Sequence, residues 1–271
     1  MPPKSRTYQP QKVRAALVAQ NEALRAVVHR LTAPDLDRPT RLGSWRVREL
    51  VAHLSLALSL PPAPLDGPAP EGPVLSLADY AELTRTMAEA VDTRVTGLAA
   101  DEFAGPPQEV AAAFDRSLDD LRSALDEAAA AEPGRRTALR AGRPMLLTDY
   151  LVTRLVEAVV HADDLADALG LADFPHDRQA LAAVTRMLAD AFADHVPGGA
   201  VELRIPPYAV VQAVPGPKHT RGTPPNVVET GPLTWIRLAT GRADWAAAVA
   251  DAQVSASGER SDLGEYLPVL G

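Results

Sequence analysis

The spacing of apolar residues changes once along this chain, near Pro197, and this change constrains the fold more than any other feature. Before it, apolar residues recur every three or four positions, as on one face of a helix. After it, apolar and polar residues alternate, as in strands that bury one face. The pattern predicts two domains: an all-α helical bundle in residues 1–196 and a small α+β domain in residues 197–271.

In the first domain, prolines and glycines separate the helical segments. The expected helices cover residues 13–31, 45–60, 75–98, 109–131, 146–169 and 178–195. Ser44 is the expected N-cap of the second helix, and Gly170 is expected to end the fifth. Residues 32–43 and 61–73, which hold several prolines, are expected to be loops, and the basic segment 135–143 a linker.

The second domain should contain both strands and short helices. Strands are expected at residues 200–205, 208–214, 226–229 and 253–257, and helices at residues 232–241 and 244–251. Pro232 inside the start and Gly241 past the end are the favoured order for a helix.

The charge balance excludes some partners. Acidic residues outnumber basic ones by 35 to 27, and the formal net charge is -8. Such a chain repels phosphate backbones, so we expect no nucleic-acid partner. No apolar run approaches the roughly 20 residues that span a bilayer, and the polar N-terminus lacks the apolar core of a secretion signal. We therefore expect a cytoplasmic protein without membrane insertion.

The chain contains no cysteine. It therefore has no disulfide and no nucleophilic thiol of its own. Any sulfur chemistry in this protein would need a thiol cosubstrate.

His53 is the one readily ionisable side chain in the apolar stretch 50–65. It should therefore lie inside the bundle rather than on its surface. A lone histidine on an apolar helix is more often a core residue than a metal ligand.

Glu157 and His161 lie on a flank of the expected helix 146–169, between its apolar stripe and the side that carries Asp149, Asp163 and Asp167. We expect these three aspartates to face solvent. The four-residue spacing of Glu157 and His161 lets their polar groups converge on one point. The same spacing is also that of an ordinary pair on a helix surface.

Two segments resemble the paired signatures of the DinB-like metal-binding bundle superfamily. Residues 44–54 read SWRVRELVAHL, and residues 157–165 read EAVVHADDL. The closest branch is the mycothiol-dependent maleylpyruvate isomerase type, and the resemblance covers the first domain. It implies that His53, Glu157 and His161 bind a divalent metal, most commonly zinc. It also implies a low-molecular-weight thiol, such as mycothiol, as cosubstrate.

Three nitrogen or oxygen ligands leave a fourth tetrahedral position open, which is typical of a catalytic zinc site. A metal there would favour the thiolate form of a bound thiol. Asp164 and Arg154 either orient the ligands or the substrate, or form solvent-facing salt bridges. Trp45 and Tyr150 are expected to be packing residues.

The second domain is similar to bacterial sterol-carrier-protein-like domains. The similarity rests on residues 219–230, 234–242 and 257–263. It implies a small sheet covered by helices around an apolar cavity. In the loop that follows Pro217, His219 and Arg221 are candidates for binding an anionic substrate, although the loop is equally consistent with a solvated connection. The domain does not align residue by residue with that of the isomerase, so maleylpyruvate itself is not implied as the substrate.

Two functions follow from these features. The favoured one is a metal-dependent, thiol-dependent transferase or isomerase that acts on a small molecule. The alternative is a non-enzymatic sterol or lipid carrier, in which the second domain binds an apolar ligand and the bundle is a scaffold. A third interpretation, a purely structural polar cluster, predicts no metal.

Overall fold

The computed structural model describes residues 6–58, 70–130, 134–139, 143–217 and 224–270, with backbone only for residues 81–86 and 128–130. The chain forms two compact units. One comprises Tyr8–Ser76 and Met87–Ala180, and the other comprises Met1–Thr7, Leu77–Thr86 and Leu181–Gly271. The domain boundary expected between residues 196 and 197 stays a prediction.

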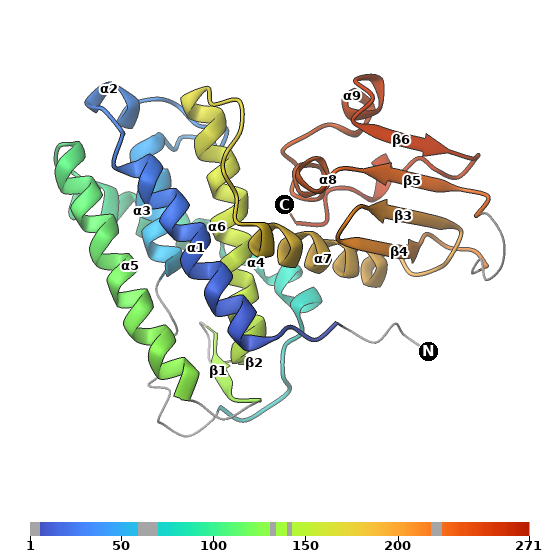
Figure 1. Ribbon diagram of the computed structural model, residues 1–271, viewed down its shortest axis with the longest axis horizontal. Coiled ribbons are helices and arrows are strands. Elements are labelled where there is room, and N and C mark those ends of the chain that lie inside the picture. Colours follow the sequence, from blue (N-terminus) through green and yellow to red (C-terminus); the bar gives the residue numbers. More distant parts are fainter. Residues whose placement is uncertain (1–5, 59–69, 131–133, 140–142, 218–223, 271) are drawn as a thin grey trace. The chain divides into compact units, whose positions relative to one another are not determined.

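Within the helical unit, a bundle is formed by α1 (Pro10–Val28), α3 (Val47–Leu58), α5 (Pro107–Ala130) and α6 (Leu147–Leu169). Both α1 and α3 contact α5 and α6, and Figure 1 shows these helices side by side. Each helix buries its apolar stripe, as the spacing predicted. Fully buried members of this core include Leu17, Leu24, Leu50, Leu54, Phe114, Leu118, Leu155 and Val159.

The helix ends follow local hydrogen bonding. Gly170 ends α6 in a left-handed conformation with φ 67°, as expected. The prediction that Ser44 caps α3 is wrong. The backbone N–H of Arg46 donates to Glu49 Oε2 at 2.9 Å, and the N–H of Leu50 donates to the carbonyl of Arg46 at 3.0 Å. The residue at the cap is therefore Arg46, and the Glu49 side chain supplies the capping bond.

Two short elements lie in segments where connections were expected. A one-turn helix, α2 (Ala33–Leu36), tolerates Pro34 because proline in the first turn lacks only an N–H that the helix does not use. In the basic segment, the chain forms β1 (Arg136–Ala138), which pairs antiparallel with β2 (Pro144–Leu146) directly after that segment. Strands of this length are too short for an alternating pattern to reveal them.

Among the described residues, two further long helices are α4 (Leu77–Ala100) and α7 (Arg178–His195), and the chain passes from one unit to the other within each of them. Both were expected, and α7 has the predicted bounds. Within the described part of the chain, none of the helices combines the length and the apolar character that a membrane crossing requires.

The second unit contains the strands and short helices that the sequence predicted, and its sheet is mixed. Its strands β3 (Val201–Ile205), β4 (Ala209–Ala213), β5 (Val227–Thr230) and β6 (Val254–Ser257) lie in the order β4-β3-β5-β6. Strands β3 and β5 are parallel, and the other neighbours are antiparallel. Between β5 and β6 the chain forms α8 (Pro232–Ala239) and α9 (Trp245–Ala250), and a 3-10 turn, η2 (Gly264–Tyr266), follows.

An ion-pair cluster joins α1 to α5. The carboxylate of Asp115 accepts from Arg25 Nε at 2.7 Å and lies 2.9 Å from His29 Nε2. The hydrogen bond from Arg25 lowers the pKa of Asp115. Since the folded pKa is below the unfolded one, this stabilisation is present above the ordinary carboxyl pKa and is lost as the pH falls through the folded value.

We expect Asp115→Asn to lower the urea midpoint of unfolding at pH 7 by a small amount, because the cluster is solvent-accessible. The difference from wild type should shrink as the pH falls below about 4, where the carboxylate is protonated in the unfolded chain. Urea titrations at pH 7 and pH 3 measure this. Asp120→Asn, at an exposed position of the same helix, is the control. An equal loss at both pH values would contradict the ion-pair interpretation.

Candidate metal centre

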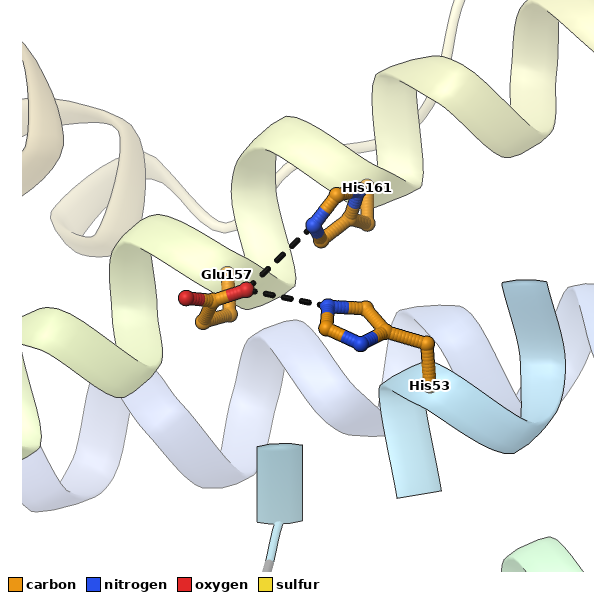
Figure 2. Close-up of side chains that lie close together, drawn as sticks. All are labelled: His53, Glu157 and His161. Carbon is orange, nitrogen blue, oxygen red and sulfur yellow. Dashed lines mark hydrogen bonds and ion pairs between the residues drawn. The ribbon is translucent and has the colours of Figure 1, made fainter. Parts of the chain in front are cut away.

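His53 lies in the middle of α3 and is buried, with 8% of its surface exposed. The helix is apolar on most sides because it packs against both α5 and α6. The interior position predicted from the apolar stretch is therefore confirmed. Figure 2 shows the imidazole of His53 directed at α6.

Glu157 and His161 lie one turn apart on α6, and their polar groups converge on the same point as the ring of His53 (Figure 2). Glu157 Oε2 lies 3.1 Å from His53 Nε2 and 3.3 Å from His161 Nε2. The two imidazole centroids are 4.5 Å apart, with the rings nearly perpendicular. Each residue thus offers one ligand atom, and the three atoms lie within 4.8 Å of one another.

This geometry fits a tetrahedral metal ion. Zinc bonds to histidine nitrogen and carboxylate oxygen are about 2.0–2.2 Å long, so neighbouring ligand atoms in a tetrahedron lie about 3.3–3.6 Å apart. The two distances from Glu157 Oε2 lie within a few tenths of an ångström of that range. Two imidazoles and one carboxylate are also the donor types that zinc accepts in catalytic sites. The position of Glu157 relative to each histidine therefore suits such an ion, and all three ligand atoms lie within 4.8 Å of one another.

The electrostatics of the cluster favour an ionised carboxylate. Burial raises the pKa of Glu157, but hydrogen bonds to His161 and His53 outweigh burial and bring it well below the ordinary value. Burial lowers the pKa of His53. Burial also lowers the pKa of His161, but its hydrogen bonds to Asp164 and Glu157 raise it to about 9. Glu157 is thus in the charged form that a metal ligand requires.

The side chains around the three residues include two aromatic rings and a cation. Tyr150 is buried and Trp45 is partly exposed, with the Trp45 ring 5.1 Å from that of His53. Asp92 fixes Trp45 by accepting from its Nε1 at 2.7 Å. The guanidinium of Arg154 lies 5.1 Å from the Tyr150 ring centroid, and its Nη2 is 3.8 Å from Glu157 Oε1. Arg154 therefore lies beside the cluster, and its side chain is only 15% exposed.

The solvent face predicted for α6 is partly wrong. Asp167 is exposed as expected, but Asp163 is only 3% exposed and forms an ion pair with Arg41 at 2.6 Å. Burial raises the pKa of Asp149, which is also not fully exposed. The loop before α3 brings Arg41 to this part of α6, so Asp163 and Asp164 pair with a cation instead of facing water.

Arg41 is the residue near the cluster that sequence reasoning missed. It lies more than 100 positions from its partners, and no periodic pattern connects them. A signal was present in the adjacent pair Asp163 and Asp164, because two neighbouring acids require a cation if a loop covers them. The alternative of a solvent-facing salt bridge for Asp164 is excluded, because its side chain is fully buried.

His219 and Arg221 lie outside the described residues. Their role in binding an anionic substrate stays a prediction.

Comparisons with known proteins agree with this fold. Residues 17–166 match the family model described as "Mycothiol maleylpyruvate isomerase N-terminal domain", and residues 177–269 match the model described as "Bacterial SCP ortholog". A comparison with curated proteins gives no match.

Two solved structures share the fold over nearly the whole chain. The crystal structure of the mycothiol-dependent maleylpyruvate isomerase is 16% identical, with a TM-score of 0.57 and 97% of each chain covered. The crystal structure of a histidine-to-alanine mutant of that isomerase is 16% identical, with a TM-score of 0.56 and the same coverage. At this identity the likeness shows the fold alone. The first family model, however, spans more than half of the chain, and the chain therefore belongs to the mycothiol maleylpyruvate isomerase N-terminal domain family.

Proposed function

We propose that this protein is a metal-dependent enzyme that uses a low-molecular-weight thiol, such as mycothiol, in a transferase or isomerase reaction on a small molecule. The observation that carries this proposal is the convergence of His53, Glu157 and His161 on one point, at distances suited to a tetrahedral ion. We place the reaction in the cytoplasm, where thiols stay reduced.

The composition of the chain supports an external thiol. Without cysteine, the protein has no sulfur nucleophile. A zinc ion held by three protein ligands would leave one coordination position for a thiol and favour its thiolate form at neutral pH. The thiol would therefore supply the nucleophile that the chain lacks.

The protein's own residues would bind the metal ion and orient the substrate. Glu157 would contribute one negative charge to the ligand set, and the imidazoles of His53 and His161 would complete it. Because the pKa of His161 is raised to about 9 in the absence of an ion, metal binding would have to displace a proton from this residue. Arg154, next to Glu157 Oε1, would place a positive charge at the edge of the site. An anionic group of the substrate would be attracted there. His219 and Arg221 are further candidates for binding such a group, and their neutral variants should raise KM more than they lower kcat.

Metal and thiol binding test the proposal together. Protein purified without a polyhistidine tag should contain about one zinc ion per chain. After replacement of zinc by Co²⁺, addition of the thiol should produce a sulfur-to-metal charge-transfer band, because the thiolate enters the open position. A protein that binds neither ion, or a cobalt spectrum that the thiol leaves unchanged, would contradict the proposal.

The match of residues 177–269 to "Bacterial SCP ortholog" favours one alternative, a sterol or lipid carrier. A carrier needs no metal, and it should retain an apolar ligand through purification. Organic extraction of the same preparation, followed by mass spectrometry, measures this. An apolar compound at about one per chain, together with absent metal, would favour the carrier over the enzyme.

A further inference from the structure

We propose that Arg41 is a positioning residue for the metal site and that it acts on His161 through Asp164. This inference rests on the proposed function, because it assumes that His161 is a metal ligand.

The guanidinium of Arg41 binds two neighbouring carboxylates of α6. Its Nε donates to Asp164 Oδ1 at 2.5 Å, and its Nη2 donates to Asp163 Oδ2 at 2.6 Å. Asp167 Oδ1 lies farther away, at 4.0 Å from Nη1. A planar fork with donors in fixed positions suits this pair of acceptors better than a lysine would.

Asp164 connects Arg41 to His161, because each of its two carboxylate oxygens accepts a hydrogen bond from one of them. While Oδ1 accepts from Arg41, the other oxygen, Oδ2, accepts from His161 Nδ1 at 2.8 Å. With the proton of Nδ1 committed to Asp164, Nε2 is the ring nitrogen available to a metal ion. That nitrogen lies 3.3 Å from Glu157 Oε2, on the side of the ring that faces the other two ligand groups. The hydrogen bond that His161 donates to Asp164 therefore fixes both the tautomer and the orientation of the His161 ring.

Because Asp164 is buried, its negative charge needs a nearby positive charge such as that of Arg41. The side chain of Asp164 is 0% exposed and that of Asp163 is 4% exposed, whereas Arg41 is 25% exposed. Two adjacent carboxylates in such a position repel each other, and a buried charge is costly without a counter-charge. Removing the guanidinium would let Asp164 turn away from His161.

The loop that carries Arg41 is closed by its own hydrogen bonds. The backbone N–H and the hydroxyl of Thr40 both donate to the carbonyl of Trp45, at 3.0 and 2.7 Å, and the N–H of Trp45 donates to the carbonyl of Leu42 at 3.2 Å. Gly43 turns the chain with φ 64°, a conformation that glycine adopts without strain. Since α3 and His53 follow directly, Arg41 links the start of one ligand-bearing helix to the other.

The simpler interpretation is an ion pair that only stabilises the fold. The two interpretations differ in what they predict for Asp163. If the ion pair only stabilises, losing either carboxylate should have a similar effect on metal binding. If Arg41 positions His161, metal binding should respond to Asp164 and Arg41 and should tolerate the loss of charge at Asp163.

The zinc affinities of the untagged wild type and four untagged variants distinguish the two interpretations. Wild type, Arg41→Met, Arg41→Lys, Asp164→Asn and Asp163→Asn are stripped of metal and titrated with zinc against a chromophoric chelator. The temperature is one at which circular dichroism shows each protein folded. We expect Arg41→Met and Asp164→Asn to weaken zinc binding about 10- to 100-fold, and Asp163→Asn less than about threefold. Arg41→Lys should recover part of the loss, because it keeps the charge but not the fork.

The inference is wrong if Arg41→Met binds zinc as tightly as wild type, or if Asp163→Asn is weakened as much as Arg41→Met. Should Arg41→Met fail to fold, Asp164→Asn and Arg41→Lys replace it, and wild-type affinity in both overturns the inference. These results leave the proposed function intact as long as wild type binds zinc. A wild type that binds no zinc instead refutes the proposed function, and the inference with it.

Discussion

Replacing His161 by alanine is expected to reduce the metal content of the untagged protein from about one ion per chain to near zero. The substitution removes one of three protein ligands and leaves Glu157 and His53 without the third corner of the site. Two ligands on separate helices hold a divalent ion far more weakly than three. Inductively coupled plasma mass spectrometry after desalting measures the metal content directly.

Control variants distinguish the loss of a metal ligand from a loss of folded structure. His195→Ala removes an exposed histidine at the end of α7 and should leave the metal content unchanged. Glu157→Gln keeps the shape of the side chain but removes the anionic oxygen, and it should also lose the ion. Circular dichroism must show that the variants keep their helices. Full metal content in folded His161→Ala would rule out the proposed ligand set.

Replacing Trp235 by alanine is expected to lower the free energy of unfolding of the α+β unit by about 3–5 kcal/mol. Trp235 lies on α8, is 1% exposed and is the largest fully buried side chain in the described residues. Its ring packs edge-to-face on Phe192, with the centroids 5.6 Å apart. The substitution removes this contact and leaves a cavity. Urea unfolding followed by circular dichroism gives the loss.

Two further variants serve as comparisons for Trp235→Ala. Val210→Ala, at a strand position that is 56% exposed, should change the free energy by no more than about 0.5 kcal/mol. Trp235→Phe should cost less than half as much as Trp235→Ala, because it keeps a ring in contact with Phe192. It also removes an indole N–H that has no hydrogen-bond partner among the residues described. A loss below about 1 kcal/mol in Trp235→Ala would show that the site collapses around the gap.

Much of the fold was predictable because its signals are local. The period of apolar residues defined α6 and α7, and Gly170 and Pro197 marked where each ends. Alternation identified β3, in which every second side chain is buried. The pair β1 and β2 was not predictable. Its strands have three residues each, which is too short for an alternating pattern. They are recognised only from their antiparallel pairing in the structure.

The clustering of the three candidate ligand residues was predictable, but their surroundings were not. His53, Glu157 and His161 were chosen from two motifs and lie within 4.8 Å of one another. The environment of α6 was misjudged, because helical periodicity assigns Asp163 to the outside and carries no information about a distant loop. The adjacent acids Asp163 and Asp164 indicate that a cation is needed, but no local pattern identifies it as Arg41. Arg41 precedes Asp163 by 122 positions and Asp164 by 123, so only tertiary packing brings them together.

Glu157 Oε2 contacts histidines on two helices, and an ion bound there would change how the protein unfolds. This oxygen contacts His53, which precedes Glu157 by 104 residues, and His161, only four residues farther on. An ion at that point would tether α3 to α6, so neither helix could leave the bundle before the ion dissociates. Slow opening of these two helices, seen as amide hydrogens that exchange only after a chelator is added, would be the kinetic signature of such a tether.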